Sequence, residues 1–244
     1  MNSFLFVLIC SFIIFIATSL GALFVYFFKN INSKTEKICL GLASGIMFAA
    51  SIFSLLLPAL DSSKYIFILL GFIIGVVIII KLDKLVDKYS KFNSKKNTML
   101  FIAMTLHNIP EGMTVGLMST YAYQSNNSIS ISMALALTIG IAIQNIPEGA
   151  AISFNYRQEG CTKFKACILG ILSGIVEPIS SLIMFFLFKY ISILLPFILS
   201  SAASIMIYVV VNDLLPDSNK DNNNLGTIYF IVGFIIMMTL DILL

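Results

Sequence analysis

Long runs of apolar residues, separated by short polar segments, fill most of this chain. A membrane-spanning helix needs about 20 mostly apolar residues, and eight runs approach or exceed that length. They lie at about residues 4–28, 38–60, 65–82, 98–119, 129–153, 164–188, 194–215 and 226–244. The runs are continuous and do not alternate between apolar and polar positions, which excludes a transmembrane β-barrel. The pattern predicts an all-α membrane protein, a bundle of eight transmembrane helices in one domain over residues 1–244.

The composition agrees with this pattern and excludes a soluble globular protein. Hydrophobic residues make up 59% of the 244 positions and charged residues only 11%, with a mean hydropathy of +0.99. So few charges cannot cover the surface of a soluble domain. No basic residue precedes the first run, which begins at Phe4, so we expect a span there and not a cleaved signal peptide. The expected partner is the lipid bilayer, and no nucleic acid is expected.

The basic residues predict the orientation of the bundle. Of the fifteen, all except Lys64 and Lys189 lie in alternate connecting segments, on one side of the predicted membrane. Cytoplasmic segments carry the excess of Lys and Arg. We therefore expect a multi-pass protein of the plasma membrane with both termini outside the cytoplasm. The lysine-rich segment 83–97 is expected to be a solvated cytoplasmic loop, with a regulatory role through Asp83 and Asp87 as the alternative.

Two adjacent spans contain the same unusual string of polar residues at mid-span. The fourth span includes HNIPEG at 107–112, and the fifth includes QNIPEG at 144–149. Ionisable residues at membrane depth are energetically unfavourable and usually functional. The alternative is that proline kinks recruit Asn and Glu as structural caps. A kink does not require a carboxylate together with a histidine, however, and His107 is the only histidine in the chain.

The spacing inside each copy places the polar side chains on one helix face. The first residue and the Glu are four apart, and the Asn and the Glu are three apart. Each proline also frees a backbone carbonyl four residues upstream. Imidazole, amide oxygens and two carboxylates together suit a divalent cation. The predicted metal ligands of the two copies are His107, Asn108, Glu111, Gln144, Asn145 and Glu148.

Five further residues are weaker candidates. Glu177 lies in the sixth span between a glycine and a proline, and Met47 in the second span offers a thioether, although each could be purely structural. Asp61 and Asp241 fall at the outer ends of their spans, where they either attract cations or are simply solvated. Asp213, beside an asparagine near the inner end of the seventh span, could line an exit.

These residues resemble the ZIP (Zrt/Irt-like) family of metal transporters, and in particular its bacterial GufA-like branch. The resemblance covers the whole chain and is carried by the paired HNxPEG and QNxPEG motifs. It implies a binuclear metal centre halfway across the membrane, in which Glu111 and Glu148 bridge both ions. One ion would be held by Met47, His107, Glu111, Gln144 and Glu148. The other would be held by Asn108, Glu111, Asn145, Glu148 and Glu177, with Asp61 and Asp241 near the outer entrance.

The predicted function is a zinc-preferring importer of divalent metal ions, with no organic cofactor. Gln144 stands where many members of the family have histidine, so transport of Fe²⁺, Mn²⁺ or Cd²⁺ with broad selectivity is the alternative. An intramembrane metalloenzyme is a further class, but it would need a second histidine, and no enzymatic activity is expected. A metal sensor without transport, and an exporter, are also compatible with the sequence, and a homodimer is neither required nor excluded.

Overall fold

The computed structural model describes residues 2–27, 33–62, 64–92, 96–125, 128–158, 160–191, 194–220 and 224–243. Within these ranges the chain contains helices and no strand. The elements are α1 (Ser3–Phe27), α2 (Ser33–Ala50), η1 (Ser51–Leu56), α3 (Leu57–Asp61), α4 (Tyr65–Phe92), α5 (Lys96–Ser125), α6 (Ser128–Gln158), α7 (Lys163–Gly174), α8 (Val176–Ile191), α9 (Leu195–Val209), η3 (Val210–Leu214), α10 (Leu215–Ser218) and α11 (Leu225–Leu243). The all-α class predicted from the sequence is confirmed.

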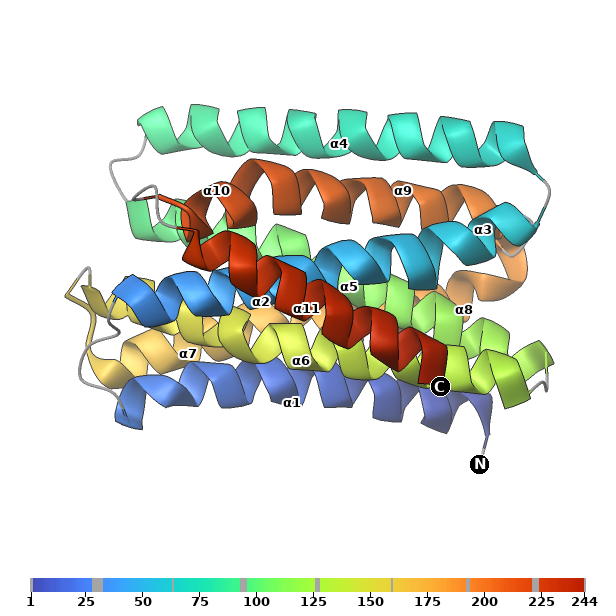
Figure 1. Cartoon of the computed structure of the whole chain (residues 1–244), viewed down its shortest axis with the longest axis horizontal. Coiled ribbons are helices and arrows are strands. Elements are labelled where there is room, and N and C mark those ends of the chain that lie inside the picture. Colours follow the sequence, from blue (N-terminus) through green and yellow to red (C-terminus); the bar gives the residue numbers. More distant parts are fainter. Residues whose placement is uncertain are drawn as a thin grey trace.

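The helices run side by side along the long axis of the molecule, and both termini lie at the same end (Figure 1). We call this end, which also contains α3 and the start of α4, the terminal end. Seven helical stretches in the described part of the chain are long and apolar enough to cross a membrane. The predicted fourth span corresponds to α5, whose 30 residues include the polar motif that lowers its hydropathy. The count of eight spans therefore stays a prediction.

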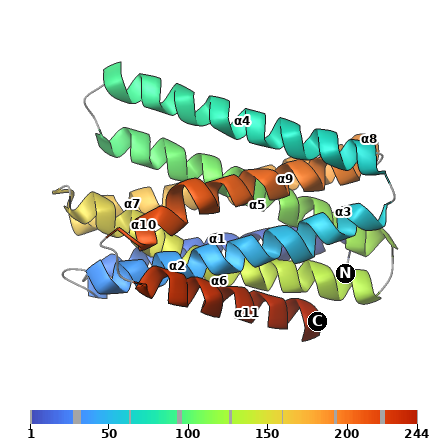
Figure 2. The same ribbon diagram turned by 45° about the horizontal axis from the view of Figure 1, so that its top comes forward.

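The helices pack as four close pairs. These are α1 with α6, α2 with α11, α4 with α9 and α5 with α8, and the last two spans of the chain can be followed in Figure 2. This pairing has an internal symmetry. If α1, α2 and α4 are matched in order with α8, α9 and α11, and α5 with α6, then the α1–α6 pair corresponds to the α8–α5 pair. The α2–α11 pair likewise corresponds to the α9–α4 pair. Contacts of α2 with α6 and of α5 with α9 join the pairs into one bundle.

Glycine allows a close approach between α1 and α6. A Cβ atom on Gly21 would overlap the backbone carbonyl of Ile146, and one on Gly149 would overlap the carbonyl of Thr18. Small residues that let helix backbones touch are typical of membrane bundles. The motif of α6 is thereby held directly against the middle of α1.

Three proline residues coincide with irregular helix geometry. Proline cannot donate a hydrogen bond to the carbonyl four residues upstream and crowds that carbonyl. The π-helical segments η1 and η3 end shortly before Pro58 and Pro216, each within a Leu-Leu-Pro sequence. The helix also breaks at Ile175, between α7 and α8, three residues before Pro178. By contrast, Pro110 and Pro147 lie inside the continuous helices α5 and α6.

The structure differs from the sequence prediction in the lysine-rich segment 83–97. Instead of ending near residue 82, α4 continues to Phe92, and α5 already begins at Lys96. Lysine and leucine have good helix propensity, so a helix that leaves the apolar region can continue through them. Most of the segment expected to be a loop is therefore a helical extension.

Candidate metal centre

The two copies of the repeated motif meet between α5 and α6. Gln144 Nε2 on α6 donates a hydrogen bond of 2.6 Å to Glu111 Oε1 on α5. Both side chains are buried, with 1% of Gln144 and 0% of Glu111 exposed. The antiparallel neighbours thus bring the first residue of one motif to the carboxylate of the other.

Glu177 joins the same region from the break between α7 and α8. Its Oε1 accepts a hydrogen bond of 2.7 Å from Thr18 Oγ1 on α1, and its side chain is fully buried. Glu177 lies in the first turn of α8, where the helix dipole favours a negative charge. Asn108 Nδ2 on α5 donates to the carbonyl oxygen of Ser173, at 3.1 Å, on the other side of the break.

Glu148 and Asn145 complete the cluster from α6. Both are buried. Glu148 lies near both Glu111 and Glu177, so the three carboxyl groups share one buried region. The side chain of Asn145 lies beside Glu111 and Glu177 but has no hydrogen-bond partner in the described part of the chain.

Five buried oxygen atoms of this cluster lack a hydrogen-bond partner among the described residues. A buried oxygen without a partner is destabilising by about 1–3 kcal/mol, and native structures contain few of them. Here they belong to one cluster, and each can donate an electron pair to a bound cation. They are Asn108 Oδ1, Glu111 Oε2, Gln144 Oε1, Asn145 Oδ1 and Glu177 Oε2.

The side chain of His107, the remaining residue of the α5 motif, lies outside the described residues, although its backbone is part of α5. Among the side chains that are described, no three His, Cys, Asp or Glu residues form a group that could hold a metal ion. The carboxylates alone therefore do not make a coordination sphere in this structure. Amide oxygens and the imidazole would have to complete it.

The other candidates from the sequence lie on α2, α3, η3 and α11. Met47 is buried in α2 among apolar core residues. Asp241 on α11 accepts a hydrogen bond of 3.0 Å from Ser54 of η1. Asp61 is exposed at the end of α3, and Asp213 in η3 accepts a hydrogen bond from the neighbouring Asn212.

Sequence reasoning missed the residues that hold the cluster in place. Thr18 orients Glu177, and the Ser173 carbonyl orients Asn108. The only signal for Thr18 is a polar residue in the middle of the first apolar run, and a backbone carbonyl has none. Ser54, the partner of Asp241, has the same weak signal.

A helical membrane bundle that buries carboxylates, together with amide oxygens that lack hydrogen-bond partners among the described residues, is typical of a cation transporter. Comparison with known families agrees with this class. Residues 94–241 match the family model described as ZIP zinc transporter, which covers more than half of the chain and includes both motifs. The chain belongs to the ZIP family, as its motifs led us to expect, and the family consists of transporters, not enzymes.

The similarity to individual zinc transporters extends over nearly the whole chain. Zinc transporter ZIPB of Bordetella bronchiseptica is 30% identical over an alignment of 253 positions, which covers 93% of this chain and 77% of that protein. Zinc transporter ZupT of Chlorobaculum parvum is 29% identical, covering 94% of this chain and 93% of ZupT. Zinc transporter GufA of Myxococcus xanthus is 30% identical, with 92% and 93% covered. These relatives agree with the predicted GufA-like branch.

Proposed function

We propose that this protein carries divalent metal ions, zinc by preference, across the membrane into the cytoplasm, through a binuclear site formed by the α5 and α6 motifs and Glu177. The observation that carries the proposal is the group of five buried, unpartnered oxygen atoms. A doubly charged ion would satisfy these oxygens and offset the repulsion among three buried carboxylates. The relatives named as zinc transporters support zinc as the cargo.

The ligands divide between two ions that share Glu111 and Glu148. The first ion would take His107, Gln144 and the thioether of Met47, a mixed set that suits a borderline ion such as Zn²⁺. The second ion would take Asn108, Asn145 and Glu177, a set made of oxygens only. The Gln144 and Thr18 hydrogen bonds would position the carboxylates for both ions.

The direction of transport is proposed from the arrangement of charge. The start of α2, the end of α4, the start of α7 and the end of α10 lie at the end of the bundle opposite the terminal end (Figure 1). These segments or the residues next to them include Lys34, Lys84, Lys163 and Lys220. With that end in the cytoplasm, the terminal end and both termini face outward from the plasma membrane. Asp61 and Asp241 lie towards the outer end to attract ions, and Asp213 lies towards the inner end where ions leave.

The chemical type of the proposed ligand atoms favours a broader selectivity that includes Fe²⁺, Mn²⁺ and Cd²⁺. All five unpartnered ligand atoms are oxygens, and oxygen ligands accept Mn²⁺ and Fe²⁺ readily. The chain offers a single histidine. Zinc is therefore the proposed preferred cargo but not an exclusive one.

Uptake of zinc into proteoliposomes tests the proposal. Mutating the groups that orient metal ligands already reduces affinity or activity by roughly 10- to 100-fold. Removal of a ligand itself by Glu111→Ala or His107→Ala should therefore abolish or severely reduce uptake. Lys220→Ala, which changes an exposed residue paired with Asp217, is the control and should transport normally. Full uptake by both ligand variants would overturn the assignment of the site.

A further inference from the structure

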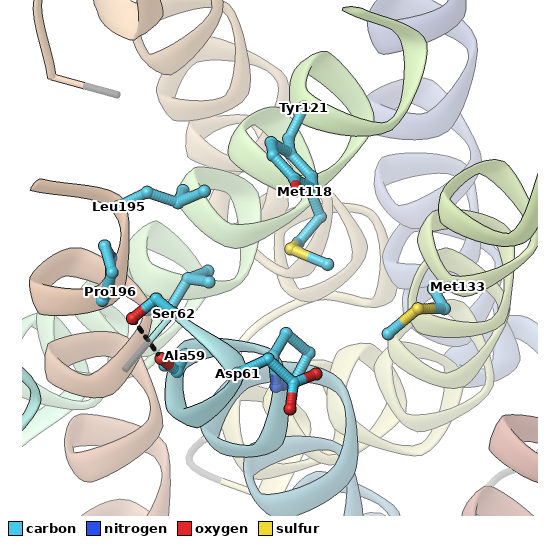
Figure 3. Close-up of a pocket in the computed structure, with 10 residues that line it drawn as sticks. Ala59, Asp61, Ser62, Met118, Tyr121, Met133, Leu195 and Pro196 are labelled. Carbon is cyan, nitrogen blue, oxygen red and sulfur yellow. Dashed lines mark hydrogen bonds between the residues drawn. The ribbon is translucent and has the colours of Figure 1, made fainter. Parts of the chain in front are cut away.

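A cavity of about 300 Å³ opens at the terminal end of the bundle, between α3, α5, α6 and α9 (Figure 3). Its lining residues include Asp61 and Ser62 at the end of α3 and Leu195 and Pro196 at the start of α9. Only Asp61 among the lining residues carries a formal charge. The cavity is separate from the central cluster, since none of the predicted central ligands lines it.

The cavity brings together side chains that could bind a cation. Met118 of α5 and Met133 of α6 both line it, and their thioether ends are directed toward the space between them (Figure 3). The Asp61 carboxylate and Tyr121 lie in the same cavity. Two thioethers, one carboxylate and one phenol form a ligand set of mixed, mostly soft character.

The helical period aligns this cavity with the central cluster. Met118 lies seven residues after Glu111 in α5, and Met133 lies eleven residues before Gln144 in α6. Seven and eleven residues are close to two and three whole turns, so each methionine shares a helix face with its motif residue. The distances along the helices are about 10 Å and about 16 Å. An ion in the cavity would therefore lie above the central site on the same two helices.

We propose that this cavity is a capture site that selects soft and borderline divalent cations before they reach the central cluster, with Met118 and Met133 as its selective ligands. The inference rests on the proposed transport of metal ions from the terminal end. It adds residues that the paired motifs do not include.

The chemistry of the ligands explains the selection. Ca²⁺ and Mg²⁺ require six or more oxygen ligands or retained waters, and thioethers are poor ligands for them. Zn²⁺ and particularly Cd²⁺ accept sulfur. A single carboxylate with neutral partners compensates only part of the ion's double positive charge, so the ion is weakly bound. Weak binding suits a site that an ion must leave in order to move inward.

Packing is the competing explanation for the two methionines, because Met commonly fills irregular apolar gaps. A leucine pair would fill the same space equally well. The Met118→Leu/Met133→Leu double variant therefore removes both sulfur atoms while keeping the volume nearly constant. Met184→Leu/Met238→Leu is the matched control, because Met184 is buried and Met238 partly buried as in the test pair, and neither lines the cavity.

Initial rates of Cd²⁺ and Mn²⁺ uptake into proteoliposomes test the proposal. We expect the double variant to raise the KM for Cd²⁺ by about tenfold with little change in maximal rate, and to leave the KM for Mn²⁺ within about twofold. Asp61→Asn should raise the KM for both ions, since it removes the charge and not the sulfur. The control should match the wild type. An unchanged Cd²⁺ KM, or equal losses for Cd²⁺ and Mn²⁺, would overturn the selective role of the thioethers.

A binding measurement separates this inference from the proposed function. In purified protein with Glu111→Ala and Glu148→Ala, the central site is removed and Cd²⁺ binding should persist at the cavity. Adding Met118→Leu/Met133→Leu should abolish it. If the wild type moves no metal, the proposed transport fails, while this binding result still decides the capture site. Cd²⁺ binding that is insensitive to the two methionines would contradict the inference.

Discussion

Each glutamate of the central cluster has a partner for at most part of its carboxylate. Glu111 accepts from Gln144 through Oε1, and Glu177 accepts from Thr18 through Oε1, while the Oε2 atom of each has no partner in the described part of the chain. A carboxylate needs both charge compensation and hydrogen bonds to stay ionised in a low-dielectric interior. The single hydrogen bonds fix the orientation of the side chains and leave one oxygen of each available to an ion.

The hydroxyl of Thr18 is therefore expected to be a positioning group for the metal. Thr18→Val keeps the shape but removes the hydrogen bond to Glu177, so we expect the KM for zinc uptake to rise by about tenfold or more. Thr18→Ser keeps the hydroxyl and should restore most of the affinity. Kinetics of Zn²⁺ uptake would measure both. Equal behaviour of the Val and Ser variants would show that the hydrogen bond is unimportant.

At this scale the sequence predicts the ligands better than the residues that orient them. Glu111, Gln144 and Glu177 stand out because charged and amide side chains are rare in apolar runs. Thr18 does not stand out, since threonine is common in membrane helices and usually bonds its own backbone. Here the Thr18 hydroxyl lies 3.2 Å from the carbonyl of Ile14, but its single proton has the shorter contact with Glu177. Its role depends on a contact across 159 positions of sequence, which no local pattern reveals.

The helices position the cluster through close packing and through breaks. Gly21 brings α1 against the α6 motif, and the interruption at Ile175 places Glu177 at the start of α8. Pro178 lacks the N–H that would bond the carbonyl of Gly174, which weakens the helix at this point. The site therefore depends on elements outside the repeated motif.

Gly21→Ala tests the close approach of α1 and α6. The added methyl group would overlap the backbone carbonyl of Ile146, and overpacking of this kind destabilises by about 1–3 kcal/mol. We expect a clearly lower midpoint of thermal unfolding in detergent, together with reduced zinc uptake. Leu20→Ala changes the preceding residue, which is 48% exposed, and should change stability by less than about 0.5 kcal/mol. Equal stabilities of the two variants would contradict the packing argument.

The existence of the helices is predictable from the apolar runs, but their ends and irregularities are less so. The hydropathy of 65–82 falls where the lysines begin, yet α4 continues to Phe92 because helix propensity does not require an apolar environment. The π-helical segments η1 and η3 follow from a proline together with local packing. A proline alone does not predict them, since Pro110 and Pro147 leave α5 and α6 continuous.

The whole bundle combines an asymmetric charge distribution with an internally symmetric pairing of helices. All-helical architecture and the neighbouring of α5 and α6 are predictable, because the connection between these two helices is short. The pairing of α2 with α11 and of α4 with α9 is not predictable. Their apolar residues face lipid and protein alike, so hydropathy does not distinguish the packed face from the exposed one.

Cysteine labelling tests the proposed orientation of the molecule. In a background without Cys10, Cys39, Cys161 and Cys167, one cysteine is introduced by Lys64→Cys at the terminal end or by Lys220→Cys at the opposite end. Both positions are exposed. A membrane-impermeant maleimide should label Lys64→Cys in intact cells and Lys220→Cys only after permeabilisation. The reverse pattern would overturn the proposed direction of the termini.

The most direct test of the account is the number of zinc ions bound by the purified protein, measured by equilibrium dialysis and elemental analysis. A binuclear site predicts about two ions per chain in a variant whose outer cavity is disabled by Met118→Leu/Met133→Leu. Adding Glu111→Gln/Glu148→Gln, which removes both bridging carboxylates at nearly constant shape, should abolish this binding. Zinc retained at the same stoichiometry without the two carboxylates would contradict the central claim that the repeated motifs hold the ion in transit.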